Sequence, residues 1–237
     1  MWHLLAQSRA VARRKRGRGG MIDFSKAREA MVDSQVRPSD VTRFAIIAAM
    51  LDVPREKFTP RAQRAVAYAD AQIPLAAGRV LLDARTFAKM LEAAEVGAGD
   101  VLLDVGAGYG YSSVVAARIA AAVVALEEDE TLAAHAAELI PAEGAHNVIV
   151  ETGPLAAGAP AAGPYDVILV EGAVEAVPEA LFAQLKDGGR LVAIVLEGPV
   201  GKAQVFTRAG DAVSSRWAFD ASAPLLPGFD VAKTFAF

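Results

Sequence analysis

The feature that most constrains the fold is an alternation of apolar runs and helical segments that begins at Asp100. The runs DVLLDVG, AVVALE, NVIVET, YDVILVE and GGRLVAIVLE are separated mostly by segments of helical character, such as YSSVVAARIA and DETLAAHAAELI. Continuously apolar runs are typical of strands buried on both faces of a parallel sheet. Their alternation with helices predicts right-handed βαβ crossovers, and therefore an α/β fold with a doubly wound, mostly parallel sheet of about seven strands.

The residues before Asp100 predict helices. An amphipathic pattern over residues 22–36 ends at Pro38, a second helix capped by Ser39 or Asp40 runs to Leu51, and a third covers residues 84–96. We expect these helices to form an N-terminal cap over the sheet edge. After residue 203, the pieces AQVFTR, SSRWAF and VAKTFAF predict two or three further strands. The expected division is a basic extension (1–20), the cap and substrate loop (21–98) and the core (99–237), with cap and core forming one domain.

The first twenty residues differ in charge from the rest of the chain. They hold six of the 24 basic residues and no acidic residue, although the whole chain has a formal net charge of −4. The remaining body is therefore strongly acidic, which argues against a broad nucleic-acid-binding face. We expect residues 1–20 to be a disordered extension, or to precede a true start at Met21. The alternative is a tail that touches RNA, DNA or anionic lipid.

Composition excludes several other classes of site. The chain has no cysteine, so disulfides, thiolate zinc sites and cysteine nucleophiles are excluded, and a reducing cytoplasmic location is expected. Its three histidines show no metal-ligand spacing, so we expect no metal site. No apolar run is long enough to span a membrane. The sequence gives no indication of the oligomeric state.

The stretch VLLDVGAGYGYSS, residues 101–113, is the strongest functional signal. Glycines at the end of a strand and before a helix place backbone N–H groups at the carboxyl edge of the sheet. The triphosphate-binding loop requires a Gly-Lys-Ser/Thr ending, which is absent here. The dinucleotide fingerprint requires a third glycine at position 111, which is Tyr111. The spacing found, with glycines at 106, 108 and 110, fits neither pattern.

Two acids accompany this glycine turn. Asp104 lies two residues before Gly106, where a carboxylate can meet an α-amino group. Glu127 ends the next apolar run, where an acid can accept hydrogen bonds from both ribose hydroxyls. S-adenosylmethionine carries an α-amino group and a ribose and has no pyrophosphate. The sequence therefore predicts S-adenosyl-L-methionine as the cofactor, bound by Asp104, Gly106, Gly108, Gly110 and Glu127.

From about Met31 to Val195 the chain resembles the protein-L-isoaspartate O-methyltransferase family. The most specific part is MVDSQVRPSDVTRFAIIAAMLDVPREKFTPRAQRAVAYAD, which follows the helical cap of that family. The glycine turn and the segment from Ala159 to Val195 follow its methyltransferase core. The resemblance implies a Rossmann-like methyltransferase fold, S-adenosylmethionine as cofactor, and carboxyl methylation of damaged aspartyl residues in protein repair.

The chain departs from the family pattern at two places. The family usually continues TGDG after the third core strand, where the Asp contacts adenine, whereas this chain has Thr152-Gly153-Pro154. The family's substrate loop reads roughly GQTISQP, and its serine is linked to the isoaspartyl carboxylate. By position, Leu82 replaces that serine and Asp83 stands beside it, so both are candidate substrate-loop residues. Asp83 is either a helix cap or a general base for a neutral acceptor, and no catalytic residue is assigned.

These departures leave three functions open. The first is methylation of isoaspartyl residues, with a protein or peptide as substrate. The second is methylation of a small molecule or another side chain by the same fold. The third is a non-catalytic member that binds the cofactor or a partner protein. Two aromatic residues beside the glycine turn, Tyr109 and Tyr111, are expected either to stack on a ligand or to pack under the cap helices.

Overall fold

The computed structural model describes residues 22–198 and 200–231. The last of the predicted strand pieces, VAKTFAF, and the basic extension 1–20 fall almost wholly outside this part of the chain. A seven-stranded sheet has the strand order β5-β4-β3-β6-β7-β8-β9, and a separate two-stranded sheet pairs β1 with β2. Strands β3 to β7 are parallel, and β8 and β9 add to the sheet as antiparallel strands. The prediction of a mostly parallel, doubly wound sheet of about seven strands is confirmed.

The strands follow the apolar runs of the sequence. The small hairpin consists of β1 (Ile73–Ala76) and β2 (Arg79–Leu81), and the central sheet consists of β3 (Val101–Val105), β4 (Ala122–Glu127), β5 (Val148–Thr152), β6 (Tyr165–Val174), β7 (Leu185–Glu197), β8 (Val200–Ala209) and β9 (Ala212–Asp220). Strands β3, β4 and β6 are buried along almost their whole length, because helices or loops cover both faces of the sheet.

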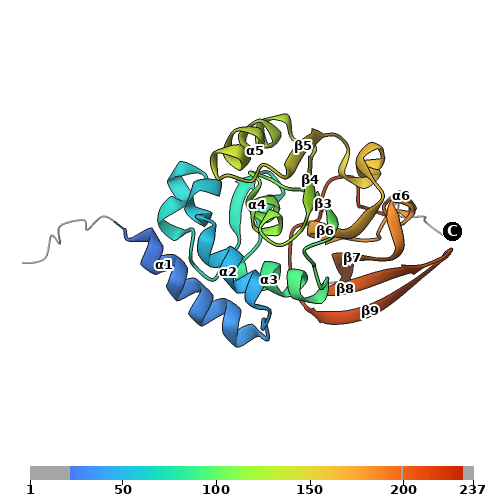
Figure 1. Ribbon diagram of the computed structural model, residues 1–237, viewed down its shortest axis with the longest axis horizontal. Helices are drawn as coiled ribbons and strands as arrows, with labels where there is room; N and C mark the ends of the chain where they lie inside the picture. The colour runs from blue at the N-terminus through green and yellow to red at the C-terminus, as the bar shows by residue number, and fades with distance from the viewer. Residues whose placement is uncertain (1–21, 199, 232–237) are drawn as a thin grey trace, which may run out of the picture.

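The helices are α1 (Phe24–Met31), α2 (Phe44–Asp52), α3 (Ala84–Ala93), α4 (Tyr111–Ala117), α5 (Glu130–Ala142) and α6 (Glu179–Ala183). Figure 1 shows α1, α2 and α3 grouped at one side of the molecule, with β8 and β9 reaching out at the other. One apolar cluster joins the cap helices, α4 and α5 to one face of the sheet. A second cluster joins α6 and the Leu225–Phe229 segment to the opposite face. The cap therefore shares its core with the sheet.

The beginning of α2 differs from the prediction. Neither Ser39 nor Asp40 caps this helix, which begins at Phe44 after Arg43. Ser39 instead bonds back to the carbonyl of the preceding helical turn, and Asp40 adopts a left-handed conformation with φ of 61°. The backbone N–H of Arg43 donates to the carboxylate of Glu92 on α3, 3.2 Å away. A tertiary contact from a distant helix therefore replaces the local cap.

Candidate functional site

The glycine turn lies between β3 and α4 at the carboxyl edge of the sheet. Gly106, Gly108 and Gly110 have φ angles of +86°, +59° and +90°, a region that residues with a Cβ rarely adopt. The N–H groups of Gly106 and Ala107 both donate to the carbonyl of Leu126 at the end of β4, at 2.9 and 3.1 Å. These bonds fix the turn against the neighbouring strand, so backbone forms the floor of the site.

Asp104 lies directly under this turn and is fully buried. Its Oδ2 atom accepts hydrogen bonds from the hydroxyls of Ser112 (2.6 Å) and Ser113 (2.5 Å), both in the first turn of α4. Its Oδ1 atom is also buried and has no hydrogen-bond partner. Burial raises the pKa of Asp104 to about 6, against the two serine hydrogen bonds, which lower it. The free oxygen is a vacant acceptor for a donor group on a ligand.

Glu127 ends β4 and is likewise fully buried. Its Oε2 accepts from the N–H of Gly108 at 2.7 Å, and its Oε1 accepts from the N–H groups of Glu128 (2.9 Å) and Asp129 (3.0 Å). The glycine turn and the start of α5 therefore both orient this carboxylate. The structure thus brings together Asp104, the three glycines and Glu127, as the sequence predicted from their positions at two strand ends.

Arg79, on β2, is a residue of this site that the sequence patterns did not identify. Its guanidinium forms a bidentate ion pair with Glu127. Nη1 lies 2.5 Å from Oε1 and Nη2 lies 2.7 Å from Oε2. No sequence signal distinguishes this arginine, since a basic residue in a short hairpin is usually exposed.

Two more polar side chains, one on the central strand β6 and one in the cap, are buried. Glu171, near the end of β6, is 5% exposed, and its Oε1 has no partner. Burial, and then the negative charge of Asp104, raises the pKa of Glu171 well above its ordinary value. The run YDVILVE ends in an acid just as AVVALE does, and this signal could have identified it. Arg55 is fully buried and donates to the carbonyls of Ala67 and Leu82, at 2.8 and 2.6 Å.

The predicted substrate-loop residues occupy different environments. Leu82 is 1% exposed, and its side chain packs in the apolar cluster between the cap and the sheet. Asp83 caps α3, because its Oδ1 accepts from the N–H of Thr86 at 2.8 Å. Asp83 also lines a surface cavity, which Leu82 does not reach.

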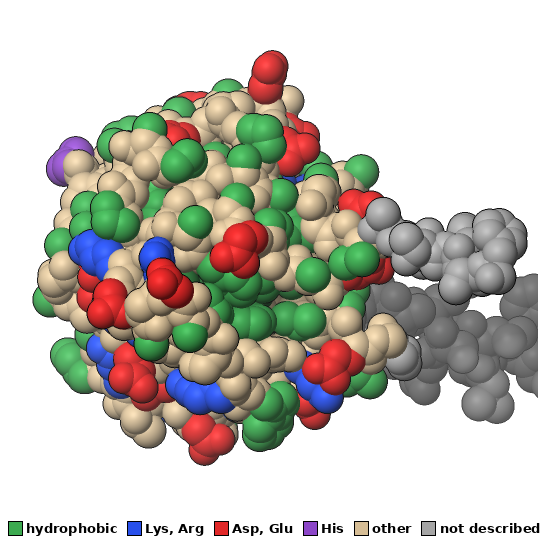
Figure 2. Space-filling model, turned by 90° about the vertical axis from the view of Figure 1, so that its right-hand side faces the viewer, with side chains coloured by type: hydrophobic (Ala, Val, Ile, Leu, Met, Phe, Trp, Pro, Cys, Tyr) green, Lys and Arg blue, Asp and Glu red, His purple; other side chains and the backbone are tan. Residues whose placement is uncertain are grey.

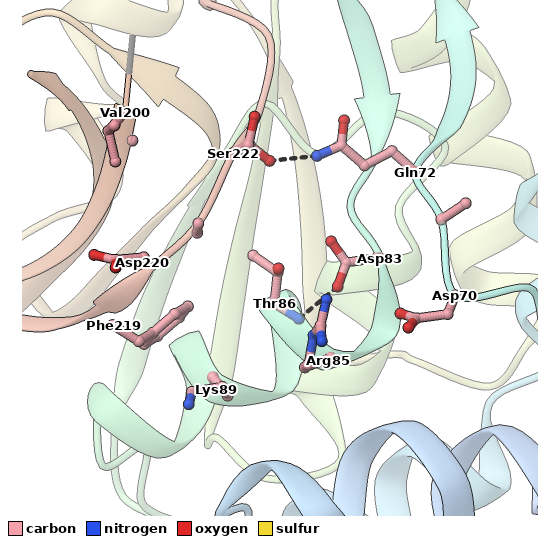
Figure 3. Close-up of a pocket in the computed structure, with 13 residues that line it drawn as sticks. Asp70, Gln72, Asp83, Arg85, Thr86, Lys89, Val200, Phe219, Asp220 and Ser222 are labelled. Atoms are coloured by element: carbon pink, nitrogen blue, oxygen red, sulfur yellow. Dashed lines mark hydrogen bonds between the residues drawn. The ribbon is translucent and has the colours of Figure 1, made fainter. Parts of the chain in front are cut away.

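That cavity has a volume of about 720 Å³ and lies between the start of α3 and the ends of β8 and β9. Figure 3 shows Asp83 just before α3 and Arg85 and Lys89 on it, across the opening from Asp220 and Phe219. The side chain of Gln72 donates to the carbonyl of Ser222 and links the two walls. Charged groups of both signs surround the cavity, so it suits a polar chain such as a peptide.

The two aromatic residues beside the turn pack against protein groups. Tyr111 is 1% exposed and contacts Phe58 and Phe87 under the cap, with the guanidinium of Arg55 5.0 Å from its ring centre. Tyr109 packs on the ring of His135 in α5, with 4.7 Å between ring centres. In this conformation, both tyrosines therefore pack against other side chains of the protein, which favours the second of the two expected roles.

Gly153 and Pro154 follow β5, the third core strand, so the chain lacks the Asp that the family usually has there. The N–H of Gly153 donates to the carbonyl of Glu127 at 3.1 Å. Pro154 precedes a short helical turn, and the N–H of Leu155 donates to the side chain of Glu128 at 3.3 Å. A carboxylate just after the end of β4, that of Glu128, therefore lies beside this turn.

The chemistry of these groups fits the cofactor that the sequence predicted. Glu127 is a carboxylate fixed by three N–H groups, Asp104 offers a buried free oxygen, and the glycines of the turn carry no side chain. Within residues 22–198 and 200–231, no three side chains of His, Cys, Asp or Glu gather as a metal site would require. In the same residues, no helix combines the length and apolar character needed to cross a bilayer.

The sheet order, the glycine turn and the acids that end β3 and β4 define a Rossmann-like methyltransferase fold. Residues 26–218 match the family model for protein-L-isoaspartate(D-aspartate) O-methyltransferase. The chain therefore belongs to the protein-L-isoaspartate O-methyltransferase family. The expectations of an enzyme of this family, and of S-adenosylmethionine as its cofactor, are confirmed.

Individual relatives and solved structures agree with this assignment. The chain is 40% identical over 179 residues to the protein-L-isoaspartate O-methyltransferase of Methylorubrum extorquens, covering 76% of this chain and 77% of that protein. It is 38% identical over 169 residues to protein-L-isoaspartate O-methyltransferase 1 of Rhodopseudomonas palustris, covering 71% and 69%.

Two solved structures share the fold. One is a protein-L-isoaspartate O-methyltransferase with a TM-score of 0.72 and 24% identity, covering 86% of this chain and 66% of that one. The other is a candidate protein-L-isoaspartate O-methyltransferase from Plasmodium falciparum in complex with S-adenosyl-L-homocysteine. It has a TM-score of 0.73 and 18% identity, and covers 87% of this chain and 99% of that one.

Proposed function

We propose that this chain uses Asp104, the glycine turn and Glu127 to bind S-adenosylmethionine and methylates the free carboxylate of isoaspartyl residues in proteins. The observation that carries the proposal is the convergence of these groups at one sheet edge. Two buried carboxylates, from neighbouring strands, flank a strip of bare backbone. This edge of an open α/β sheet is where such folds bind their ligands.

The proposed roles follow from the chemistry of each group. The carboxylate of Glu127 accepts hydrogen bonds from the ribose hydroxyls. The free oxygen of Asp104 faces the α-amino group, and the N–H groups of the glycine turn lie along the methionine part. Glu128 is positioned for a polar contact to adenine, in place of the family's Asp. When bound, the cofactor supplies an activated methyl group on sulfur.

The residues of the chain then have little acid–base chemistry to perform. A carboxylate acceptor is already an anion, so it needs no general base. The protein has to align one carboxylate oxygen with the methyl group and exclude water. The proposed activity therefore does not require a serine hydroxyl at position 82.

The cavity beside α3 is proposed to hold the peptide that carries the acceptor carboxylate. It combines Lys89 and Arg85 with Asp83 and Asp220, and its volume of about 720 Å³ accommodates several residues of a peptide. A protein substrate also agrees with the surface seen in Figure 2, where basic and acidic side chains alternate on the visible face rather than forming a basic patch. We therefore propose a protein or peptide partner rather than a nucleic acid.

We also propose roles for the two parts of the chain and a location in the cell. Residues 22–98 act as cap and substrate loop and the residues from 99 onward as the cofactor-binding core, with one continuous apolar cluster joining them. A cytoplasmic location is proposed from the absence of cysteine in the sequence.

The test is a methyl-transfer assay with purified protein and radiolabelled S-adenosylmethionine. The acceptors are an isoaspartyl peptide, the matching normal aspartyl peptide, and small carboxylic acids. We expect base-labile methyl esters on the isoaspartyl peptide alone. Esters on a small acid but not on the peptide would assign a different acceptor, and no ester on any acceptor would contradict a catalytic function.

A further inference from the structure

The guanidinium of Arg79 lies where a ligand of the glycine turn would lie. Its Nη2 atom is 3.1 Å from the position that a Cβ on Gly106 would occupy. The arginine is 4% exposed, and two of its nitrogens donate to the two oxygens of Glu127 while Nε has no partner. A charged side chain from the cap hairpin therefore occupies the acidic end of the proposed cofactor site.

Two apolar side chains fill the remaining space above the turn. Leu75, on β1, places its Cδ1 atom 2.6 Å from where a Cβ on Gly108 would be. Leu226 fills the space beside Gly172, with an atom 2.5 Å from the corresponding position there. The glycines are thus in close contact with the β1–β2 hairpin and with the segment that follows β9.

The hairpin and the C-terminal segment are held together over the sheet edge. Gln72, just before β1, donates to the carbonyl of Ser222. The C-terminal segment is tied to β6 in turn, because the N–H of Leu226 donates to the carbonyl of Ala173 at 2.9 Å. Both segments lie outside the seven-stranded sheet, and a single bridge between Ala173 and Leu225 joins the C-terminal segment to β6.

Building on the proposed function, we propose that Arg79 competes with the cofactor for Glu127 and, once displaced, binds the carboxylate of the acceptor. The ribose hydroxyls and the guanidinium require the same two carboxylate oxygens, so the two cannot bind Glu127 together. The cofactor therefore has to displace Arg79 before the site is complete. Acceptor binding then depends on prior cofactor binding.

The displaced guanidinium needs another anion, because a buried charge without a partner is strongly unfavourable. A planar guanidinium matches a carboxylate in a bidentate geometry, and the acceptor is a carboxylate. Arg79 is three residues before Leu82 in the loop that aligns with the family's substrate loop, and Leu82 has no donor to offer. Arg79 therefore supplies the donor that the leucine lacks.

Two acids of the chain are rivals for the displaced arginine. Glu171 is buried with a free oxygen, but burial and the charge of Asp104 raise its pKa and so disfavour the charged form that would pair with a cation. Asp104 has one oxygen engaged by Ser112 and Ser113, and in the proposed function its other oxygen is taken by the cofactor. The acceptor carboxylate is consequently the anion left to the guanidinium.

The experiment compares Arg79→Gln with Arg37→Gln, which removes a guanidinium paired with Asp33 on the exposed surface. Calorimetric titration with S-adenosylhomocysteine measures the competition. We expect Arg79→Gln to bind it at least about tenfold more tightly than the wild type, since Glu127 is then free of its bidentate partner. We expect Arg37→Gln to bind as the wild type does.

The second measurement is the KM for an isoaspartyl peptide at saturating S-adenosylmethionine. We expect Arg79→Gln to raise this KM by at least about tenfold through the lost charge-assisted hydrogen bonds, with a smaller change in kcat. Arg79→Lys, which keeps the charge but not the bidentate geometry, should fall between the wild type and Arg79→Gln in both measurements. If Arg79→Gln does not fold, Arg79→Lys replaces it in both measurements.

The outcomes separate this inference from the function on which it rests. Equal or weaker S-adenosylhomocysteine binding by Arg79→Gln overturns the competition, while the wild type's own binding still supports the proposed function. An unchanged peptide KM overturns the role of Arg79 as acceptor-binding residue. No binding by the wild type or any variant overturns the proposed function and this inference together, whereas binding by Arg79→Gln alone supports the competition.

Discussion

The guanidinium of Arg55 donates a 2.6 Å hydrogen bond to the carbonyl of Leu82, and both residues are buried. Arg55 also bonds the carbonyl of Ala67, so one side chain ties two segments of the cap together. The backbone at position 82 is thereby fixed with the leucine side chain in the core. Position 82, which aligns with the family's serine, therefore contributes to the packing of the core in this conformation.

From this geometry we predict that Leu82→Ser lowers stability without improving methylation of isoaspartyl peptide. Removing a buried leucine and burying a hydroxyl should reduce the free energy of unfolding by about 3 kcal/mol. Urea unfolding measures this change, and Leu82→Met, which conserves volume, should lose less than about 1.5 kcal/mol. A faster isoaspartyl methylation by the serine variant would show that position 82 turns toward the acceptor.

The sheet could be predicted because its signal is local. The apolar runs ending at Asp104, Glu127 and Glu171 are continuous, and buried parallel strands need such runs. The positions of Asp104 and Glu127 follow, since neighbouring parallel strands end at one edge. The start of α2 could not be predicted, because the cap of that helix comes from Glu92, 49 residues further along the chain.

Which side chains lie in the site was also only partly predictable, because contacts between distant residues decide it. The spacing of the glycines indicates a bare backbone, but it does not indicate which side chain lies over it. The contacts of Arg79 with Glu127 and of Leu75 with Gly108 join residues far apart in the sequence. Such contacts depend on how the hairpin folds back over the sheet, which no local pattern encodes.

Substitutions of Asp83 can distinguish a role as helix cap from a role as general base. Asparagine is as good an N-cap as aspartate, whereas alanine loses about 1 kcal/mol of stability at such a position. We therefore predict that Asp83→Asn keeps both stability and isoaspartyl methylation, and that Asp83→Ala lowers the melting temperature. Thermal unfolding and the methyl-ester assay measure the two effects. A stable Asp83→Asn variant that no longer methylates isoaspartyl peptide would show that this carboxylate does more than cap α3.

Glu127 should be the residue whose loss most weakens cofactor binding. Replacing it by Gln removes the charge from an acceptor that three N–H groups orient, so S-adenosylhomocysteine affinity should fall by about 1–3 kcal/mol. Glu138→Gln, an exposed position on α5, is the matched control and should leave the affinity unchanged. Calorimetric titration compares the three proteins. Equal binding by wild type and Glu127→Gln would remove this carboxylate from the cofactor site.

The raised pKa of Asp104 predicts that the free energy of unfolding depends on pH. Its folded pKa of about 6 lies above the ordinary value of 3.8, mainly because burial disfavours the charged form. A raised carboxyl pKa contributes stability that is fully present below pH 3.8 and is lost as pH rises through about 6. The shift corresponds to about 3 kcal/mol. Asp104→Asn cannot ionise, so relative to the wild type it should gain stability between pH 4 and pH 7, roughly the window of the titration.

Urea unfolding of both proteins across that range measures the difference, and cofactor binding provides an independent check on its sign. The ionised form of Asp104 is the one suited to an α-amino group, so wild-type affinity for S-adenosylhomocysteine should strengthen as pH rises through about 6. The same rise should be smaller in Asp104→Asn. A stability difference between the two proteins that stays constant over the whole range would show that the pKa of Asp104 is not raised to about 6 in the folded protein.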